Sequence, residues 1–465
     1  MFQSNLRMSV KNEHKLAANS IGVVESIVMG TAGAAPAFSI SAVAATLIAS
    51  VNTLAPASIL YCGIIMFGIT LAFIHLNKAH VNAGASYSWV SQIFGRQLGF
   101  FVGWALLVSS ALFMVAGSIP SATATLLLIA PESVNNPGWV TFIAALWLTF
   151  ISAVTLKGIK PTSYLQLILT GIEVIILLAI IVGGIFQYHQ QSIHKFSLSW
   201  LSLTRFTPSE FAIGALSSIF LYWGWDVTLN LNEETKNTTT GPGWGAFGSV
   251  LFIILIFVSF ITVTMLVLSD DEIQQAGTNI IFAIADKLFP RPWSYLAILS
   301  ILMSAVGTIE TTIVQFTRTL FAQGRDGIVN PCYAKLHSTW YTPWVAILFI
   351  WGFGLIFLFL SSFFSSVNLI IKDSINSIGL QVAFYYSLTG FACAWYYRSL
   401  WRNLTELLSY VLWPLFSSTF LIFIAILSIP TFDLITNLIG IGGLILGVVP
   451  FTWNLQTTWK KQAKP

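Results

Sequence analysis

Four acidic residues lie within or beside long apolar stretches, where an ionised carboxylate is unfavourable. Glu173, Asp226 and Glu310 lie inside such stretches, and Glu25 lies one turn before the first predicted helix interruption. A charge at the bilayer centre costs about 2.5–3.5 kcal/mol on insertion scales, so each carboxylate needs a partner, a proton or a function. All four are therefore candidates for proton coupling. The alternative for Glu173 and Glu310 is hydrogen bonding between helices, and for Asp226 it is capping the half-helix that follows.

Hydroxyl residues beside Glu310 suggest a second kind of ion chemistry. Thr308, Thr311 and Thr312 have side chains that can supply oxygen ligands to Na⁺, and they equally fit ordinary hydrogen bonding between helices. The 3 cysteines are scattered without a paired spacing, so the sequence predicts neither a disulfide framework nor a metal centre. We expect no cofactor, with H⁺ as the coupling ion and Na⁺ as the alternative.

A run of small residues interrupts the first apolar stretch, which extends from about Ile21 to Ala49. Pro36 removes a backbone donor just after this run, which favours a true break over close packing of an intact helix. A helix broken in mid-membrane exposes the positive N-terminal end of its second half, where free amides can hold a carboxylate. The predicted anion-binding residues are Gly30, Thr31, Ala32, Gly33 and Ala34.

A second interruption lies about half a chain later, at residues 219–226. Large aromatic side chains surround Gly224, and they lie too deep in the span for an interfacial belt. Asp226 adds a charge that could attract a substrate ammonium group. Two broken spans in corresponding places are typical of secondary transporters. The predicted binding residues of this break are Phe220, Tyr222, Trp223, Gly224, Trp225 and Asp226.

The composition shows how these residues must be positioned. With 56% hydrophobic residues, 8% charged residues and a mean hydropathy of +0.81, the chain is an integral membrane protein. Its basic residues are spread thinly, so the net charge of +4 does not indicate a nucleic-acid partner. At about 20 residues per crossing we predict twelve spans, with 77–97 as an amphipathic connection along the cytoplasmic interface and 270–288 as a short helix on the outer face. The spans are 20–48, 54–76, 96–129, 138–157, 162–187, 209–232, 243–268, 291–322, 343–361, 367–396, 405–429 and 432–456.

The distribution of Lys and Arg predicts the orientation. Most of them fall in tails and loops on one side, whereas Lys195, Arg205, Lys287 and Arg291 fall on the other. Because cytoplasmic loops are enriched in Lys and Arg, both termini are predicted to be cytoplasmic.

Three motifs resemble those of the amino acid–polyamine–organocation (APC) superfamily of secondary transporters, amino acid permease type. They are residues 82–89 (NAGASYSW), 230–237 (NLNEETKN) and 318–327 (RTLFAQGRDG). The resemblance implies an all-α membrane protein of 12 transmembrane helices with a LeuT-type inverted repeat of five plus five spans and discontinuous helices 1 and 6. The implied division is a tail at 1–19, a transport core of spans 1–10 at 20–396, spans 11–12 at 397–456, and a tail at 457–465.

The same resemblance implies roles for the two interruptions. The α-carboxylate of a substrate would meet the amides of Gly30 to Ala34, and its amino group would meet carbonyls of Phe220 to Gly224. Phe220, Tyr222 or Trp223 would close over it from outside. Several members of this family carry a lysine at the position of Glu173. Because a carboxylate stands here instead of an ammonium group, the resemblance does not say which ion is coupled to transport in this chain.

These observations predict a plasma-membrane transporter for an amino acid or related amine, working by alternating access and coupled to protons. The alternatives are an exchanger and a Na⁺-coupled symporter. We find no motif of an enzyme, such as Gly-x-Ser-x-Gly or His-Glu-x-x-His. The expected partners are the small-molecule substrate and the lipid bilayer, and the sequence leaves the oligomeric state open.

Overall fold

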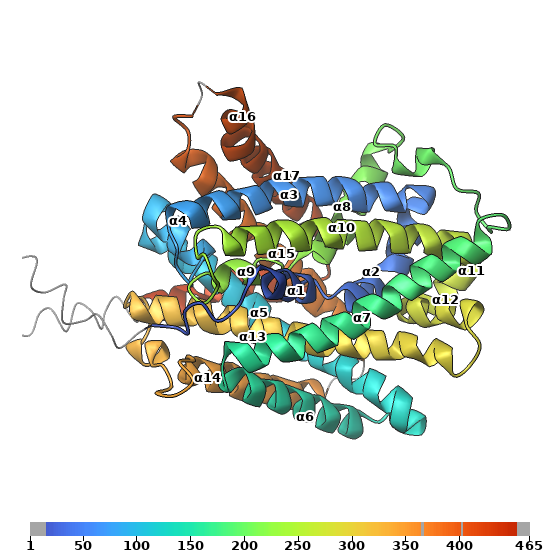
Figure 1. The fold of residues 1–465 in the computed structure, drawn as a ribbon, viewed down its shortest axis with the longest axis horizontal. Helices are drawn as coiled ribbons and strands as arrows, with labels where there is room; N and C mark the ends of the chain where they lie inside the picture. Colours follow the sequence, from blue (N-terminus) through green and yellow to red (C-terminus); the bar gives the residue numbers. More distant parts are fainter. Residues whose placement is uncertain (1–14, 364–366, 401–402, 453–465) are drawn as a thin grey trace, which may run out of the picture.

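The computed structural model describes residues 15–363, 367–400 and 403–452, and the regular elements in these ranges are helices (Figure 1). The predicted tail 457–465 and most of the tail 1–19 lie outside the described residues. The helices are α1 Val23–Gly33, α2 Pro36–Val51, α3 Ala55–Ala79, α4 Ser86–Phe94, α5 Arg96–Ile129, α6 Pro137–Leu156, α7 Ile159–Tyr188, α8 Pro208–Ile219, α9 Val227–Asn230, α10 Gly241–Val267, α11 Asp270–Ala276, α12 Ile280–Leu288, α13 Leu296–Arg325, α14 Trp344–Ser361, α15 Val367–Tyr396, α16 Leu404–Glu406, α17 Trp413–Ser428 and α18 Leu434–Leu446.

Among the described residues, nine helical stretches are long and apolar enough to cross a membrane. The first, Val23–Ala79, contains predicted span 54–76 and all of span 20–48 from Val23 onward. Predicted spans 209–232 and 367–396 are not among the nine, because the former is interrupted and the latter carries polar side chains such as Lys372 and Gln381. The all-α membrane architecture is confirmed, and the count of twelve spans stays a prediction.

The broken helices lie at the centre of the molecule. Figure 1 shows the long helices running roughly parallel to one another, with the short α1 and α9 among them. The helix α13 packs along α5 and α7, and α10 packs along α1 and α3. The pair α6 and α14 covers one side of this core, and α17 and α18 pack on α15. The broken segments are thus enclosed by helices from both halves of the chain.

The peripheral helix α6 presents an apolar stripe away from the core. Trp139, Phe142, Leu146 and Phe150 each remain about half exposed, at 50–53%. Their spacing of three and four residues places them on one helix face. A face of this composition suits contact with lipid tails rather than with water.

Candidate functional site

The first interruption is short. α1 continues through Gly33, and α2 begins at Pro36, with Ala35 at a φ of 49° in the left-handed region. The amides of Ala34 and Ala35 bond back into α1, to Gly30 O at 3.4 Å and Ala32 O at 3.0 Å. The predicted break at Gly30 to Ala34 is therefore wrong in extent, because Gly30, Thr31 and Ala32 remain helical and only residues 34–35 leave the helix.

Gly30 serves close packing instead. A Cβ atom at this position would lie within 2.9 Å of the Thr228 methyl group and would also meet Ser249 of α10. The small-residue packing alternative therefore holds for Gly30, since only a glycine lets α1 approach both neighbours this closely.

The start of α2 is occupied by side chains from two distant helices. Pro36 has no N–H, the Ala37 N–H donates to Glu173 Oε1 of α7 at 2.8 Å, and the Phe38 N–H donates to Ser304 Oγ of α13 at 3.1 Å. Glu173 is 1% exposed. Its carboxylate thus lies at the positive end of the α2 dipole, where a negative charge is stabilised.

The second interruption meets the first one directly. α8 ends at Ile219, a 3-10 turn covers Phe220–Tyr222, and Gly224 has a φ of 98° before α9 begins at Val227. A Cβ atom on Gly33 would overlap the Gly224 carbonyl oxygen, and a Cβ atom on Gly224 would overlap that of Gly33. The two breaks therefore pack backbone against backbone, which only glycine permits.

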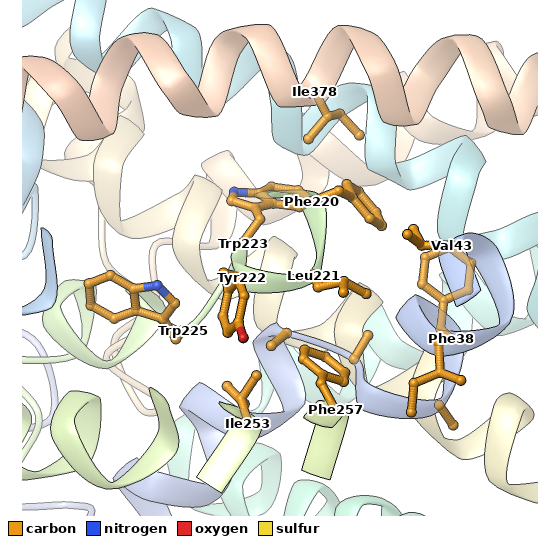
Figure 2. Packing of buried hydrophobic residues seen from close by; sticks show 14 of the residues in the cluster. Phe38, Val43, Phe220, Leu221, Tyr222, Trp223, Trp225, Ile253, Phe257 and Ile378 are labelled. Carbon is orange, nitrogen blue, oxygen red and sulfur yellow. The ribbon is translucent and has the colours of Figure 1, made fainter. Parts of the chain in front are cut away.

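The aromatic residues of the second break point in different directions (Figure 2). The Tyr222 hydroxyl donates to Ile59 O of α3 at 2.8 Å, and the Trp225 ring lies 5.2 Å from Phe73 and is fully buried. The Trp223 indole N–H donates to the Tyr385 hydroxyl at 3.0 Å. Tyr222 and Trp225 are thus anchored within the helix packing.

Asp226 is held by uncharged donors from two helices. Its Oδ2 accepts from Gln315 Nε2 of α13 at 2.6 Å and from the Tyr385 hydroxyl at 3.1 Å. Its Oδ1 accepts from the Tyr386 hydroxyl of α15 at 2.8 Å. Asp226 makes no capping bond to α9, so the capping alternative is wrong. Among the described residues no Lys, Arg or His forms an ion pair with it.

Glu310 is buried in α13 and faces α7. With the Gln166 amide oriented so that its oxygen accepts from Thr170 Oγ1 at 2.8 Å, its nitrogen donates to Glu310 Oε2 at 2.6 Å. In the described part of the chain, Glu310 Oε1 has no hydrogen-bond partner. The residues Gln166, Thr170 and Glu173 lie on one face of α7, so the two buried glutamates border one polar strip.

The predicted position of Glu25 is wrong. Because α1 runs to Gly33, Glu25 lies more than two turns before the break. Its Oε2 accepts from the Gly22 N–H at 3.0 Å, as a cap of the α1 N-terminus. This partly exposed side chain is not brought near either break.

The hydroxyls suggested as Na⁺ ligands bond to backbone carbonyls. Thr308 Oγ1 lies 2.7 Å from Ala32 O and 2.8 Å from Ser304 O, and Thr311 Oγ1 donates to Thr308 O at 3.1 Å. In the described ranges, His, Cys, Asp and Glu form no group of three that could hold a metal ion. The suggestion of Na⁺ near Thr311 and Thr312 stays a prediction.

A cavity of about 1100 Å³ lies at one end of the bundle. Its lining includes Ile298 near the start of α13, together with Phe38 and Phe220 from the segments next to the breaks. We call this end the outer end and the end that holds Arg318 the inner end. The Phe38 ring contacts the Phe113 ring at a centroid distance of 5.9 Å, and the Phe113 ring contacts the Trp223 ring at 5.4 Å. Of the three predicted gate residues Phe220, Tyr222 and Trp223, it is Phe220 that lines this cavity.

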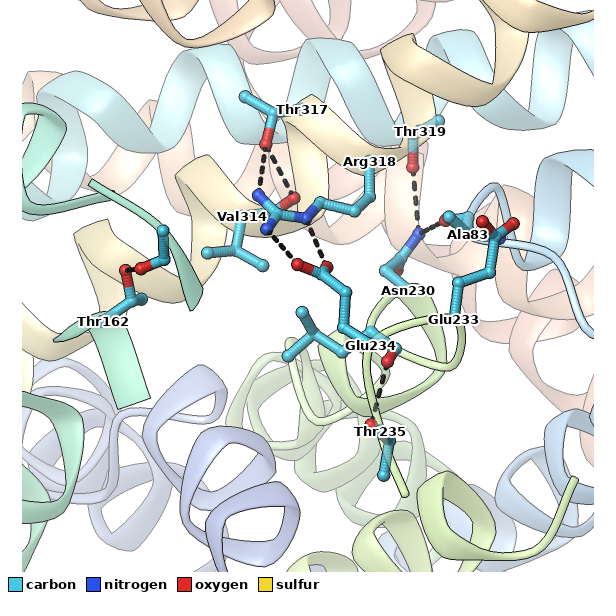
Figure 3. Close-up of polar contacts among 12 residues, drawn as sticks. Ala83, Thr162, Asn230, Glu233, Glu234, Thr235, Val314, Thr317, Arg318 and Thr319 are labelled. Carbon is cyan, nitrogen blue, oxygen red and sulfur yellow. Dashed lines mark hydrogen bonds and ion pairs between the residues drawn. The ribbon is translucent and has the colours of Figure 1, made fainter. Parts of the chain in front are cut away.

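A buried ion pair closes the inner end (Figure 3). Arg318 of α13 donates twice to Glu234, through Nε and Nη2 at 2.9 Å each, and both side chains are 1% exposed. The backbone of Glu234 also accepts from the Ser20 N–H at 2.8 Å. The segment before α1 is thereby fixed against the segment after α9.

A second, less buried pair lies beside it. Arg325 donates to Glu233 at 2.8 and 3.0 Å, and Glu233 Oε1 also accepts from the Ala83 N–H at 2.9 Å. Asn230 Nδ2 bonds to Ala83 O at 2.9 Å and to Thr319 Oγ1 at 3.1 Å. The three motifs at 82–89, 230–237 and 318–327 thus meet at the inner end.

Comparison with known proteins agrees with this geometry. Residues 20–453 match the protein family described as amino acid permease. The chain belongs to the amino acid permease family. Together with the apolar helices, this membership shows that the chain is a multi-pass membrane protein.

Three relatives of this permease chain are named transporters. A 292-residue region is 25% identical to the branched-chain amino acid permease of Lactococcus lactis subsp. cremoris and covers 58% of this chain and 60% of the relative. A 312-residue region is 25% identical to the serine/threonine exchanger of Bacillus subtilis, covering 63% and 65%. A 314-residue region is 23% identical to the large neutral amino acids transporter small subunit 2 of Mus musculus, covering 66% and 58%. The matched regions span less than two thirds of these relatives' lengths.

Several site residues of this permease chain were missed from the sequence. Gln315, Tyr385 and Tyr386 surround Asp226, and Ser304 bonds the start of α2. The polar residues 166, 170 and 173, spaced by four and three within an apolar helix, were a usable signal of a polar face on α7. For the two adjacent tyrosines, the sequence offered no comparable pattern.

Proposed function

We propose that this chain is a secondary active transporter that moves an amino acid or related amine across the plasma membrane by alternating access. The observation that carries this proposal is the backbone contact of Gly33 with Gly224, together with a cavity whose lining includes Phe38 and Phe220 from the segments next to the breaks. Two interrupted helices that meet in the middle of the bundle supply backbone groups that can bind a small polar solute. The cavity gives the solute access from one side, and a carrier then opens toward the opposite side to release it.

The arrangement fits an outward-facing state. The cavity lies at the end that the distribution of Lys and Arg predicts to be outside, and the buried pair of Glu234 and Arg318 closes the end predicted to be inside. Transport to the cytoplasm then requires this pair to separate. The proposal includes cytoplasmic termini, a core of two inverted five-span repeats at 20–396, and two further spans at 397–456.

Proton coupling is the proposed energy source. Glu173, Asp226 and Glu310 are buried carboxyl groups, and within the described residues none of them forms an ion pair. A carboxyl group in such surroundings can hold a proton in one state of the cycle and release it in another. An exchange mode is the second candidate, because one relative is named as a serine/threonine exchanger.

A thermal-stability panel tests the substrate class. Purified protein is mixed with each amino acid and with the amines that lack the corresponding carboxyl group, and its melting temperature is measured. A bound substrate at about 100 times its Kd stabilises the folded state by about 2.7 kcal/mol, so a true substrate raises the melting temperature by several degrees. D-amino acids serve as matched controls. If no member of the panel shifts the melting temperature of folded protein, the proposed function is wrong.

A further inference from the structure

The break in the first span has no free amide in this state. The amides of Ala34 and Ala35 bond into α1, Pro36 has none, and the Ser39 N–H bonds to Ala35 O at 2.8 Å. The two remaining donors bond to Glu173 and Ser304. Since unpaired helix N-terminal amides are what makes such a break an anion site, the chain's own carboxylate already fills the place expected for a substrate carboxylate.

No cation neutralises Glu173 in the described part of the chain. Its α7 carries Lys160, Tyr164 and Tyr188, which lie toward the two ends of that helix. The helices α2, α6 and α10, which pack against α7, carry no ionisable side chain. The other elements packed on α7 contribute Glu25 on α1, Glu310, Arg318 and Arg325 on α13, and Asp286 and Lys287 on α12.

The cations in that set are already engaged. Arg318 and Arg325 pair with Glu234 and Glu233, and Lys287 pairs with Glu272 at 2.7 Å. The carboxyl group that shares the α7 to α13 interface with Glu173 is Glu310, which would add repulsion rather than relieve it. The dipole of α2, the Ala37 N–H and the Ser304 hydroxyl are therefore the stabilising partners of an ionised Glu173.

We propose that Glu173 and the substrate carboxylate compete for the Ala37 amide, so that a substrate bearing a carboxylate binds only when Glu173 is protonated. Two like charges about 4 Å apart at an effective dielectric constant of about 20 weaken binding by roughly a thousandfold, so joint occupancy by two anions is disfavoured. In the exchange, a hydronium ion on the cavity side transfers its proton to a carboxylate oxygen of Glu173 and is left as a water molecule. The hydrogen bond from Ala37 then passes from Glu173 to the substrate carboxylate.

This competition separates two substrate classes. An amino acid takes up one proton on binding, because it displaces the Glu173 carboxylate. An amine without a carboxyl group leaves Glu173 in place as its counter-charge and takes up none. This inference rests on the proposed function. It adds that the carboxyl group of the substrate determines whether a proton is taken up on binding.

Proton uptake on binding tests the competition. Calorimetric titration in buffers of different ionisation enthalpy, over about pH 5–9, counts the protons that enter with the ligand. The probes are the amino acid that stabilises the protein most in the panel and the amine that lacks its carboxyl group, for example L-leucine and 3-methylbutylamine. We expect one proton per amino acid, with Kd rising about tenfold per pH unit where Glu173 is ionised, and no proton for the amine.

Two variants complete the experiment. Glu173→Gln keeps an oxygen that can accept from Ala37 and loses the charge, so it should bind the amino acid with a Kd that does not change with pH. Glu25→Gln, in the distant cap of α1, should keep the wild-type pH dependence. Proton-free binding by the wild type, or unchanged proton uptake in Glu173→Gln, would overturn the inference while leaving the transporter proposal intact. If no amino acid or amine binds the wild type, the proposed function itself fails.

Discussion

Replacing Glu234 with glutamine is expected to lower the free energy of unfolding by about 3–5 kcal/mol, because it leaves the Arg318 guanidinium buried without a counter-charge. The pair is bidentate, with both hydrogen bonds at 2.9 Å, and each side chain is 1% exposed. The loss can be measured as the change in unfolding free energy in detergent with a chemical denaturant. It should appear together with faster opening of the inner end, since the pair joins α13 to the segment after α9.

The neighbouring pair provides a matched control. Glu233→Gln removes the negative charge from a second Glu–Arg pair, whose side chains are 21% and 25% exposed. We therefore expect the free energy of unfolding to fall by only about 1 kcal/mol. Replacing Glu234 and Arg318 together with Leu and Met should recover most of the stability, since no charge is then left unpaired. Equal losses for Glu233→Gln and Glu234→Gln would contradict the assignment of the buried pair as the main closure.

Gly224→Ala is expected to reduce transport by about 100-fold, because it forces the two breaks apart. Gly224 has a φ of 98°, which is unfavourable for alanine, and the new Cβ atom would overlap the Gly33 carbonyl oxygen. Displacing either backbone changes the position of the groups proposed to hold the substrate. The measurement is initial uptake of the labelled amino acid, normalised to folded protein in the membrane.

Gly352→Ala is the control for this substitution. Gly352 lies in α14, and a Cβ atom added there would meet no neighbouring atom within 4 Å, so alanine should be tolerated or stabilising by about 0.5–1 kcal/mol. Transport should stay at the wild-type level in this variant. Normal uptake by Gly224→Ala would show that the contact between the breaks is not needed for transport.

Long apolar runs made most helices predictable. Predicted spans 96–129 and 138–157 agree with α5 and α6 to within one residue, because polar or proline-containing turns bound them. Pro36 indicated where the first break lies, but the sequence did not predict which residues leave the helix. Glycine serves both helix packing and helix interruption, and the local sequence does not tell Gly30, which packs on α10, from Gly33, which meets Gly224.

The partners of the buried carboxylates depend on tertiary structure. Ala37 and Glu173 are 136 positions apart, and Gln315 and Asp226 are 89 apart. Spacing along one helix indicates which residues share a face, but it does not say which face of another helix they meet. The sequence therefore predicted that Glu173 and Asp226 need partners and could not name Ala37 or Tyr386 as those partners.

The most direct test of the central claim is counterflow in proteoliposomes. Vesicles loaded with the unlabelled amino acid from the stability panel are diluted into a trace of the same amino acid carrying a label. A carrier that alternates access around the two breaks predicts a transient, saturable accumulation of label above equilibrium, which Gly224→Ala abolishes and Gly352→Ala retains. Absence of any accumulation with folded wild-type protein, or flux that does not saturate, would contradict the account.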